Sequence, residues 1–150
     1  MLTQRKVYSE GVKRGPEIAW AQLRALALEA ATRAYAPYSH VSVGAAALCA
    51  NGDVVVGSNV ENASYGLTLC AECSLVSDLV RTRGGRLLAA SIVAGDGKPI
   101  APCGRCRQLL FEHGGNGLLI DAGPDAAPMR LEALLPGAFG PDDLDARRDS

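Results

Sequence analysis

The amino-acid sequence predicts an α/β fold in which a mixed β-sheet is flanked by helices. Segments with helical apolar spacing alternate with short apolar runs bounded by turn residues, in the order α-β-β-α-β-α-β. This alternation is typical of a sheet sandwiched between helices. The chain has 150 residues, of which 48% are hydrophobic, and it has no internal repeat. That is enough apolar material for one core, so we expect one folded domain.

The predicted domain spans residues 16–140 and has a polar segment at each end. Residues 1–15 lack clear periodicity, so we expect a mobile N-terminal extension, and residues 141–150 form a polar C-terminal tail. Pro16 suits the first turn of a helix, and the apolar residues after it recur at helical spacing. This helix should end before Pro37.

The remaining elements follow from turn signals and apolar runs. Asn51-Gly52 is a strong hairpin signal, and it predicts that the two flanking runs pair as antiparallel strands. Glycine pairs end both later helices. After the first helix, the predicted elements are strands at 41–50 and 53–60, a helix at 70–83, a strand at 86–95, a helix at 103–113, a strand at 117–123 and a brief helix at 131–135.

Composition and charge disfavour several classes of partner. Fifteen basic and sixteen acidic residues give a formal charge of -1, and no basic run is longer than a pair such as Arg147-Arg148. A nucleic acid polymer rewards clustered positive charge and is therefore disfavoured. No apolar stretch approaches the roughly 20 residues of a membrane span. The first 16 residues lack the apolar segment of a secretory signal, and four of the five cysteines have metal-ligand spacing. We expect a cytoplasmic protein with reduced thiols.

The cysteine motifs C-A-E-C at 70–73 and C-G-R-C at 103–106 carry the chemistry. Thiolates are preferred zinc ligands, so one interpretation is a closed structural site with four thiolates. The other uses Cys70, Cys103 and Cys106 and leaves the fourth position to water. The apolar helix predicted after Cys70 and the adjacent carboxylate of Glu72 favour the open site, because an acid–base group is more useful beside an open position than beside a filled one.

An open site of this kind supports hydrolytic deamination. Both motifs begin predicted helices, whose N–H groups stabilise thiolate charge. Zinc lowers the pKa of a bound water, and Glu72 is placed to take its proton and deliver it to a substrate nitrogen. Three cysteines, a water and a glutamate that does not bind the metal are one known arrangement of the zinc deaminases. We therefore expect one Zn²⁺ per chain.

These motifs resemble those of the cytidine deaminases, specifically their compact homotetrameric form. The resemblance rests on C-A-E at 70–72, P-C-G-R-C-R-Q at 102–108, N-V-E-N-A-S-Y-G at 59–66 and P-Y-S-H-V-S-V-G-A-A at 37–46. It extends from about Trp20 to Phe139. It implies a three-layer sandwich and zinc-dependent conversion of cytidine and deoxycytidine to their uridine counterparts, with release of ammonia, in pyrimidine salvage. It also implies a homotetramer whose active sites are completed by neighbouring subunits.

The resemblance assigns roles to nine residues. The implied zinc ligands are Cys70, Cys103 and Cys106, and the implied catalytic proton shuttle is Glu72. The implied substrate contacts are Asn59, Glu61, Ala71, Tyr65 and Phe139. The resemblance implies that Asn59 and Glu61 bind a ribose hydroxyl and that the backbone of Ala71 contacts the base. The phenylalanine packs on the base from a neighbouring subunit, and the tyrosine lies in a segment that often contributes across subunits.

Two positions depart from the family pattern. Many members have Phe at the position of Val41, and many have Arg at the position of Cys73, where it donates hydrogen bonds to the thiolates. Arg105 and Arg107 are candidates for replacing that charge, and ordinary surface roles are equally open to them.

Two alternative functions also stay open at this point. An aminopyrimidine antibiotic deaminase of the blasticidin S type shares the two cysteine motifs, although Glu61-Asn62 favours a nucleoside pocket. A noncatalytic zinc module with four thiolates is the alternative from another class of protein.

Overall fold

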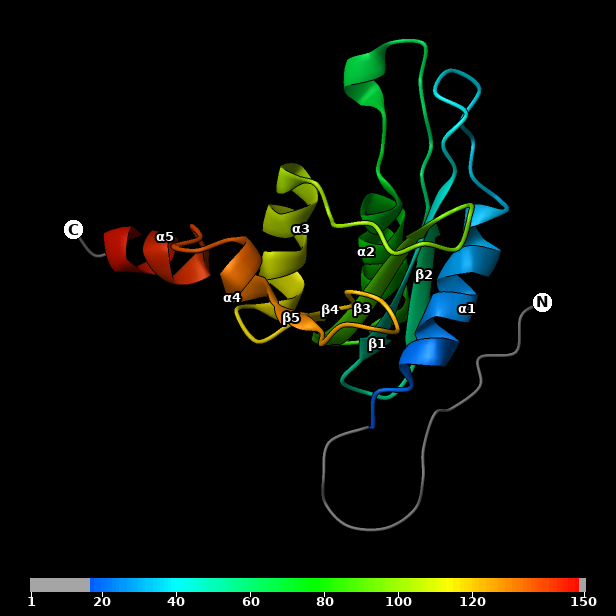
Figure 1. The fold of residues 1–150 in the computed structure, drawn as a ribbon. Coiled ribbons are helices and arrows are strands. Elements are labelled where there is room, and N and C mark those ends of the chain that lie inside the picture. Colours follow the sequence, from blue (N-terminus) through cyan, green and yellow to red (C-terminus); the bar gives the residue numbers. More distant parts are fainter. Residues whose placement is uncertain (1–16, 149–150) are drawn as a thin grey trace.

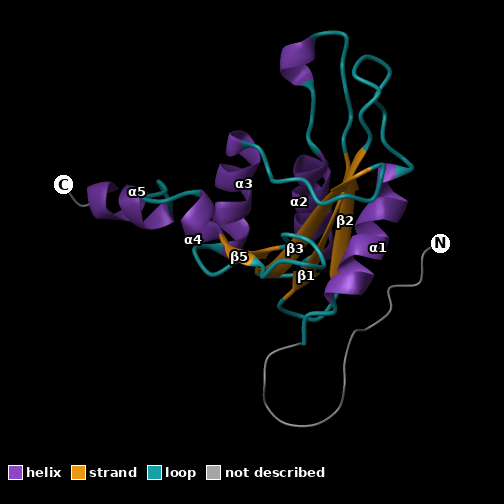
Figure 2. Cartoon of the chain, viewed as in Figure 1, coloured by secondary structure: helices purple, strands orange, loops and turns teal. Residues whose placement is uncertain are grey.

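The computed structural model describes residues 17–148 and confirms the α/β sandwich (Figures 1 and 2). The helices are α1 (Trp20–Ala31), η1 (Tyr65–Leu67, a 3₁₀ turn), α2 (Ala71–Thr82), α3 (Gly104–Gly114), α4 (Leu131–Leu134) and α5 (Pro141–Arg148). The strands are β1 (Val43–Cys49), β2 (Val54–Ser58), β3 (Leu87–Ala94), β4 (Leu119–Ile120) and β5 (Met129–Arg130). They form one sheet in the order β2-β1-β3-β4-β5, in which only β3 and β4 are parallel. The predicted mixed sheet is therefore confirmed.

Strand β1 lies at the centre of the core and is buried on both faces. Ala45 and Ala47 belong to the apolar cluster that contains the buried side chains of α2 and α3. Ala46 and Leu48 belong to the cluster that contains those of α1. Since alternate residues of a strand point to opposite faces, α1 covers one face of the sheet and α2 with α3 cover the other, giving three layers (Figure 1).

A glycine sets how closely α2 approaches the sheet. A Cβ atom added to Gly57 of β2 would lie 2.2 Å from the carbonyl oxygen of Ala71 and 2.4 Å from the backbone nitrogen of Leu75. Only a residue without a side chain permits this contact. The first turn of α2, which follows Cys70, is consequently pressed against the strand.

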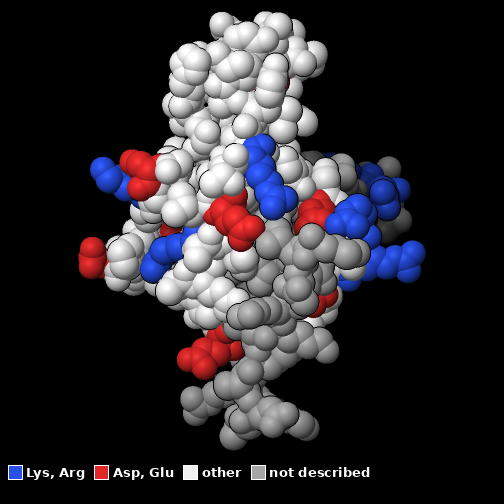
Figure 3. Space-filling model, turned by 90° about the vertical axis from the view of Figure 1, so that its right-hand side faces the viewer, with Lys and Arg blue, Asp and Glu red and all other residues white. Residues whose placement is uncertain are grey.

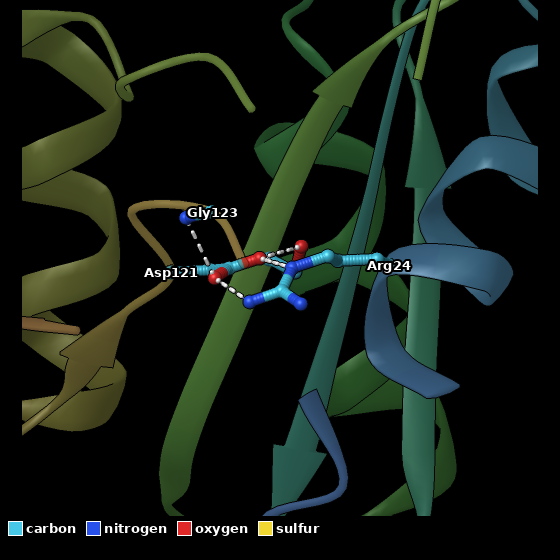
Figure 4. A network of polar contacts seen from close by, with 4 residues as sticks. Arg24, Asp121 and Gly123 are labelled. Atoms are coloured by element: carbon cyan, nitrogen blue, oxygen red, sulfur yellow. Dashed lines mark hydrogen bonds and ion pairs between the residues drawn. The ribbon is translucent and has the colours of Figure 1, made fainter. Parts of the chain in front are cut away.

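A partly buried ion pair joins α1 to the end of strand β4 (Figure 4). The Arg24 guanidinium donates two hydrogen bonds of 2.7 Å to the carboxylate of Asp121, the residue after β4. The hydroxyl of Ser91 and the N–H of Gly123 donate to the same carboxylate. Burial raises the pKa of Asp121, but these donors outweigh burial and hold the pKa below its ordinary value.

Two segments project beyond the sheet, at the top of Figure 1. Residues 35–42 precede β1 and residues 59–69 follow β2, and a backbone bridge between Tyr35 and Val60 holds them together. The rings of Tyr38 and Tyr65 lie 5.7 Å apart at their centroids. In the view of Figure 3 this projecting end is almost free of charged side chains, whereas the body below it carries both signs.

The C-terminal segment contains two elements that were not predicted. Residues 141–148 of the polar tail form helix α5, and Met129–Arg130 form strand β5. Acidic residues in the first turn of α5 and Arg147 and Arg148 in its last turn match the helix dipole, which explains a helix without apolar periodicity. The predicted extension at residues 1–15, and Pro16, lie outside the described residues. Within the described part of the chain, no helix is long and apolar enough to cross a membrane.

Candidate zinc centre and substrate cavity

Two cysteines occupy equivalent positions at the beginning of two helices. Cys70 is the N-cap residue of α2, and Cys103 is the N-cap residue of α3. Their backbones are nearly identical, with φ and ψ of -67° and 161° at Cys70 and of -65° and 168° at Cys103. This extended conformation places the two sulfur atoms 3.9 Å apart beside the positive ends of both helices.

The third sulfur comes from Cys106 in the first turn of α3, where it is fully buried. The sulfur atoms of Cys70, Cys103 and Cys106 all lie within 4.8 Å of one another. Ligands about 2.3 Å from a tetrahedral zinc ion are separated by about 3.8 Å, close to the distance between the first two sulfurs. Within residues 17–148 this is the one group of three or more candidate ligands, and Cys73 does not belong to it. The donor set fits an open site with three thiolates.

The thiols need a cation to become three thiolates together. Burial raises the pKa of Cys70 and of Cys106. Burial also opposes ionisation of Cys103, but the N–H of Cys106 and the neighbouring sulfurs outweigh it and lower the Cys103 pKa. A dication at the centre of the cluster offsets both the desolvation and the mutual repulsion.

Glu72 lies beside the cluster and is shielded from water, since only 4% of its surface is exposed. Burial raises the pKa of its carboxyl, against weaker opposing contributions from its own backbone N–H, Cys106 and Arg105. A carboxyl with a raised pKa exchanges protons more readily near neutral pH, which is what a general acid–base group requires.

A cavity of about 170 Å³ opens onto these residues. Glu72, Cys70 and Cys103 lie on one side of it, and two predicted substrate contacts, Asn59 and Ala71, also line it. Further lining residues that were not predicted are Val43, Thr68, Ile92, Ile100 and Ala101. Apolar walls with a few convergent polar groups are typical of a small-molecule site.

The side chain of Asn59, at the wall of the cavity, is hydrogen-bonded to the backbone of the segment that leads into β1. Its side-chain oxygen accepts a hydrogen bond of 2.8 Å from the N–H of Val43, and its amide nitrogen donates one of 2.9 Å to the carbonyl of Val41. Asn59 is buried, so these bonds hold its amide rigidly at the cavity wall.

Glu61 does not line the cavity of its own chain. Its carboxylate accepts hydrogen bonds from the N–H groups of Tyr38 and Ser39, at 2.9 and 3.2 Å, and from the Ser39 hydroxyl. The hydroxyl bond is the main reason that the pKa of Glu61 lies below its ordinary value. The carboxylate therefore fastens one projecting segment to the other.

Tyr65 and Phe139 also lie away from the cavity of their own chain. The Tyr65 side chain is at the exposed tip of the projecting end, next to Tyr38. Phe139 is exposed in the segment between α4 and α5, where its carbonyl accepts a hydrogen bond from Gln108 of α3. The predicted role of both residues across a subunit boundary stays a prediction.

Arg105 and Arg107 have different surroundings. A terminal nitrogen of Arg105 lies 3.6 Å from the Cys70 sulfur and 3.9 Å from the Cys73 sulfur. Arg107 instead donates to the carbonyls of Pro102 and Leu134. Of the two candidates, only Arg105 faces the thiols.

The fold and the site together define the class of the protein. A three-layer sandwich that brings three cysteine sulfurs and a buried glutamate together at two helix N-termini is a zinc-dependent deaminase.

Comparison with known proteins then gives the family. Residues 20–120 match the family described as the cytidine and deoxycytidylate deaminase zinc-binding region. The cytidine deaminase of Mycobacterium tuberculosis is 58% identical over 133 residues, which cover 89% of this chain and 98% of that protein. A crystal structure of cytidine deaminase from M. tuberculosis matches with a TM-score of 0.79 and 59% identity, covering 83% of this chain and 99% of that one. A crystal structure of cytidine deaminase from Burkholderia pseudomallei matches with a TM-score of 0.73 and 38% identity, covering 81% of this chain and 100% of that one. The chain belongs to the cytidine deaminase family, and its cofactor is one zinc ion per chain.

Proposed function

We propose that this chain hydrolyses cytidine and deoxycytidine to uridine and deoxyuridine, with release of ammonia. One observation carries the proposal: the buried Glu72 carboxyl shares a cavity of about 170 Å³ with two sulfurs of the zinc centre. The cavity thus combines a metal site, a group that exchanges protons, and apolar walls for a planar base.

Cys70, Cys103 and Cys106 are the proposed zinc ligands, because their sulfurs form the compact cluster. When bound there, zinc supplies a Lewis acid that lowers the pKa of water at the site. Both Cys70 and Cys103 are N-cap residues, so the positive ends of the α2 and α3 dipoles favour negative charge on their sulfurs.

Glu72 is the proposed catalytic residue. Its carboxylate accepts a proton from the attacking water as the new C4–O bond forms, and its carboxyl donates a proton to N3 of the pyrimidine. A second proton passes through the same side chain to the amine as the C4–N bond breaks. Water and cytidine thereby become uridine and ammonia, and Glu72 returns to its starting state.

Substrate binding is the proposed role of Asn59, Ala71 and Glu61. Asn59 and Ala71 line the cavity. The amide nitrogen of Asn59 carries two hydrogens, of which one bonds to the carbonyl of Val41 and the other is left to donate to a sugar hydroxyl. The backbone of Ala71, beside Glu72, is placed to orient the base. Glu61 contributes the second sugar contact from the projecting segment.

A homotetramer that completes each active site is the proposed assembly. Several large apolar side chains are exposed on the projecting end, which shows few charges in the view of Figure 3, among them Tyr35, Tyr65, Leu67 and Leu69. Exposed apolar patches of this kind mark contact surfaces. Tyr65 and Phe139 are remote from their own cavity, which supports their use by a neighbouring subunit.

The proposed setting is pyrimidine salvage in the cytoplasm. All five cysteines are free thiols, and a site made of three thiolates requires a reducing compartment.

A steady-state assay tests the activity. Ammonia release from cytidine and from deoxycytidine is measured, with zinc determined on the same preparation and blasticidin S offered as a competitor. We expect turnover of both nucleosides in proportion to zinc content. Turnover of blasticidin S without turnover of either nucleoside would point to the antibiotic deaminase, and one zinc per chain without any turnover to a noncatalytic module. Light scattering tests the assembly, for which we expect the mass of four chains.

A further inference from the structure

Arg105 reaches from one cysteine motif to the other. It is the second residue of α3, between the two cysteines of that helix, yet its guanidinium lies against α2. Nη2 of Arg105 donates a hydrogen bond of 2.8 Å to the carbonyl of Thr68, and the same atom lies 3.6 Å from the sulfur of Cys70. The Thr68 carbonyl therefore fixes a cation beside a zinc ligand.

The charge of the centre calls for such a cation. Three thiolates around one dication leave a net charge of about -1, next to the carboxyl of Glu72. The helix N-termini offer only partial positive charges to the sulfurs. Arg107, the other arginine of the motif, donates its hydrogen bonds to the carbonyls of Pro102 and Leu134 and does not face the sulfurs.

We infer that Arg105 is the counter-charge of the zinc–thiolate centre and that it holds the Cys70 sulfur in its ligating position. Cys73 also contacts this arginine, since its sulfur lies 3.9 Å from the Arg105 guanidinium. Its short side chain leaves the space that the guanidinium occupies. The arginine that many relatives carry at position 73 is thus replaced by one that arrives from the opposite motif.

The expected effect is on the metal and not on folding. Arg105 is exposed and Thr68 is partly exposed, so water can satisfy the Thr68 carbonyl when the guanidinium is removed. A donor to a ligating sulfur withdraws electron density from it, and loss of such a partner typically weakens metal binding by about 10- to 100-fold. Arg105 acts through Cys70 and is a positioning residue.

The test measures how fast the zinc-loaded, full-length protein loses its metal to an excess of a chromogenic chelator. Arg105→Gln removes the charge, Arg105→Lys keeps it, and Arg81→Gln is the matched control at an exposed arginine of α2 that pairs with Asp78. We expect zinc release about 10- to 100-fold faster in Arg105→Gln, an intermediate rate in Arg105→Lys, and the parent rate in Arg81→Gln. Parental rates in Arg105→Gln, or equally fast release from the glutamine and lysine variants, would overturn the proposal.

A spectroscopic measurement separates this role from a general loosening of the fold. In protein loaded with Co²⁺, the thiolate-to-cobalt charge-transfer band should move to lower energy in Arg105→Gln, because an unpartnered sulfur gives up its electrons more easily. An unchanged band would overturn the inference. Neither measurement involves a substrate, so the inference rests on the zinc centre, and its failure is distinguishable from failure of the proposed deamination.

Discussion

The carboxylate of Asp121 and the guanidinium of Arg24 face each other through two hydrogen bonds of 2.7 Å and connect positions that are 97 residues apart. The side chain of Asp121 is 2% exposed and that of Arg24 is 22% exposed. A nearly buried carboxylate loses most of its hydration, so its partners decide whether this region of the sheet is stable.

Arg24→Met should lower the free energy of unfolding by about 3 kcal/mol, the low end for breaking a buried ion pair, because Arg24 keeps some contact with solvent. The substitution preserves the aliphatic packing and leaves the Asp121 charge with only two neutral donors. Urea unfolding measures the change. The matched control is Arg33→Met, just beyond α1, where a loose pair with Glu29 at 3.9 Å is largely exposed; it should change stability by less than about 1 kcal/mol. Equal losses in both variants would contradict the special role of Asp121.

The pH dependence of stability should report the same carboxylate. The folded-state pKa of Asp121 lies below its ordinary value of 3.8, so the unfolded chain takes up a proton first as the pH falls. The stabilisation is therefore complete at pH values well above 3.8 and is lost as the pH falls through the folded-state pKa. In urea unfolding from pH 7 downward, the difference in stability between the parent and Asp121→Asn should stay constant and then shrink below about pH 4. A difference that widens toward acid would contradict the lowered pKa.

Much of the fold could be predicted because local signals and tertiary structure agree. The Asn51-Gly52 turn predicted the β1–β2 hairpin, and β1 itself contains no polar side chain because it is buried on both faces. Strand β5, with two exposed residues, has no such signal and exists only because it pairs with β4. Helix α5 has no buried residue and therefore no apolar stripe that a pattern could reveal.

The metal site was predictable because each cysteine motif is recognisable by its own spacing at a helix beginning, although Cys70 and Cys103 lie 33 residues apart. Side-chain contacts between other segments carry no such signal and were not predictable. The Ser39–Glu61 contact spans 22 residues, and the choice between Arg105 and Arg107 depends on which way each guanidinium leaves α3. The spacing of residues in the sequence determines neither this contact nor the direction of the two arginine side chains.

Ser39→Ala should raise KM for cytidine while leaving kcat and zinc content near the parent values. The Ser39 hydroxyl bonds to the Glu61 carboxylate, the proposed sugar contact, and without it the carboxylate is less well positioned. Because this bond is exposed to solvent, water partly replaces it, and its loss should raise KM by only a few-fold. An interaction made equally in the ground state and the transition state changes KM alone. Thr82→Ala, which removes a hydroxyl bond at the far end of α2, is the control. An unchanged KM in Ser39→Ala would argue against Glu61 as a substrate contact.

Glu72→Gln should keep its zinc and lose most of its turnover. The substitution preserves shape and removes only the ability to exchange protons, which typically contributes about 10²–10⁴-fold. Metal analysis and kcat are measured on the same sample. Glu112→Gln, at an exposed glutamate of α3, should behave as the parent does. Parental kcat in zinc-loaded Glu72→Gln would exclude the proton shuttle.

Cys73→Ser should retain one zinc ion per chain and measurable deamination. Cys73 follows the N-cap residue of α2 by three positions, as Cys106 follows that of α3, and sequence alone makes the two thiols equivalent. The structure separates them, because Cys106 is buried within the sulfur cluster while Cys73 is partly exposed and outside it.

Cys70→Ser is the comparison, and it should lose both zinc and activity because one of three protein ligands is gone. Zinc content and turnover of the two variants, measured side by side, decide between three thiolates and four. Complete loss of zinc from Cys73→Ser would make Cys73 a fourth ligand. A filled coordination sphere leaves no position for water beside Glu72, and the deaminase mechanism would then fail together with the three-thiolate site.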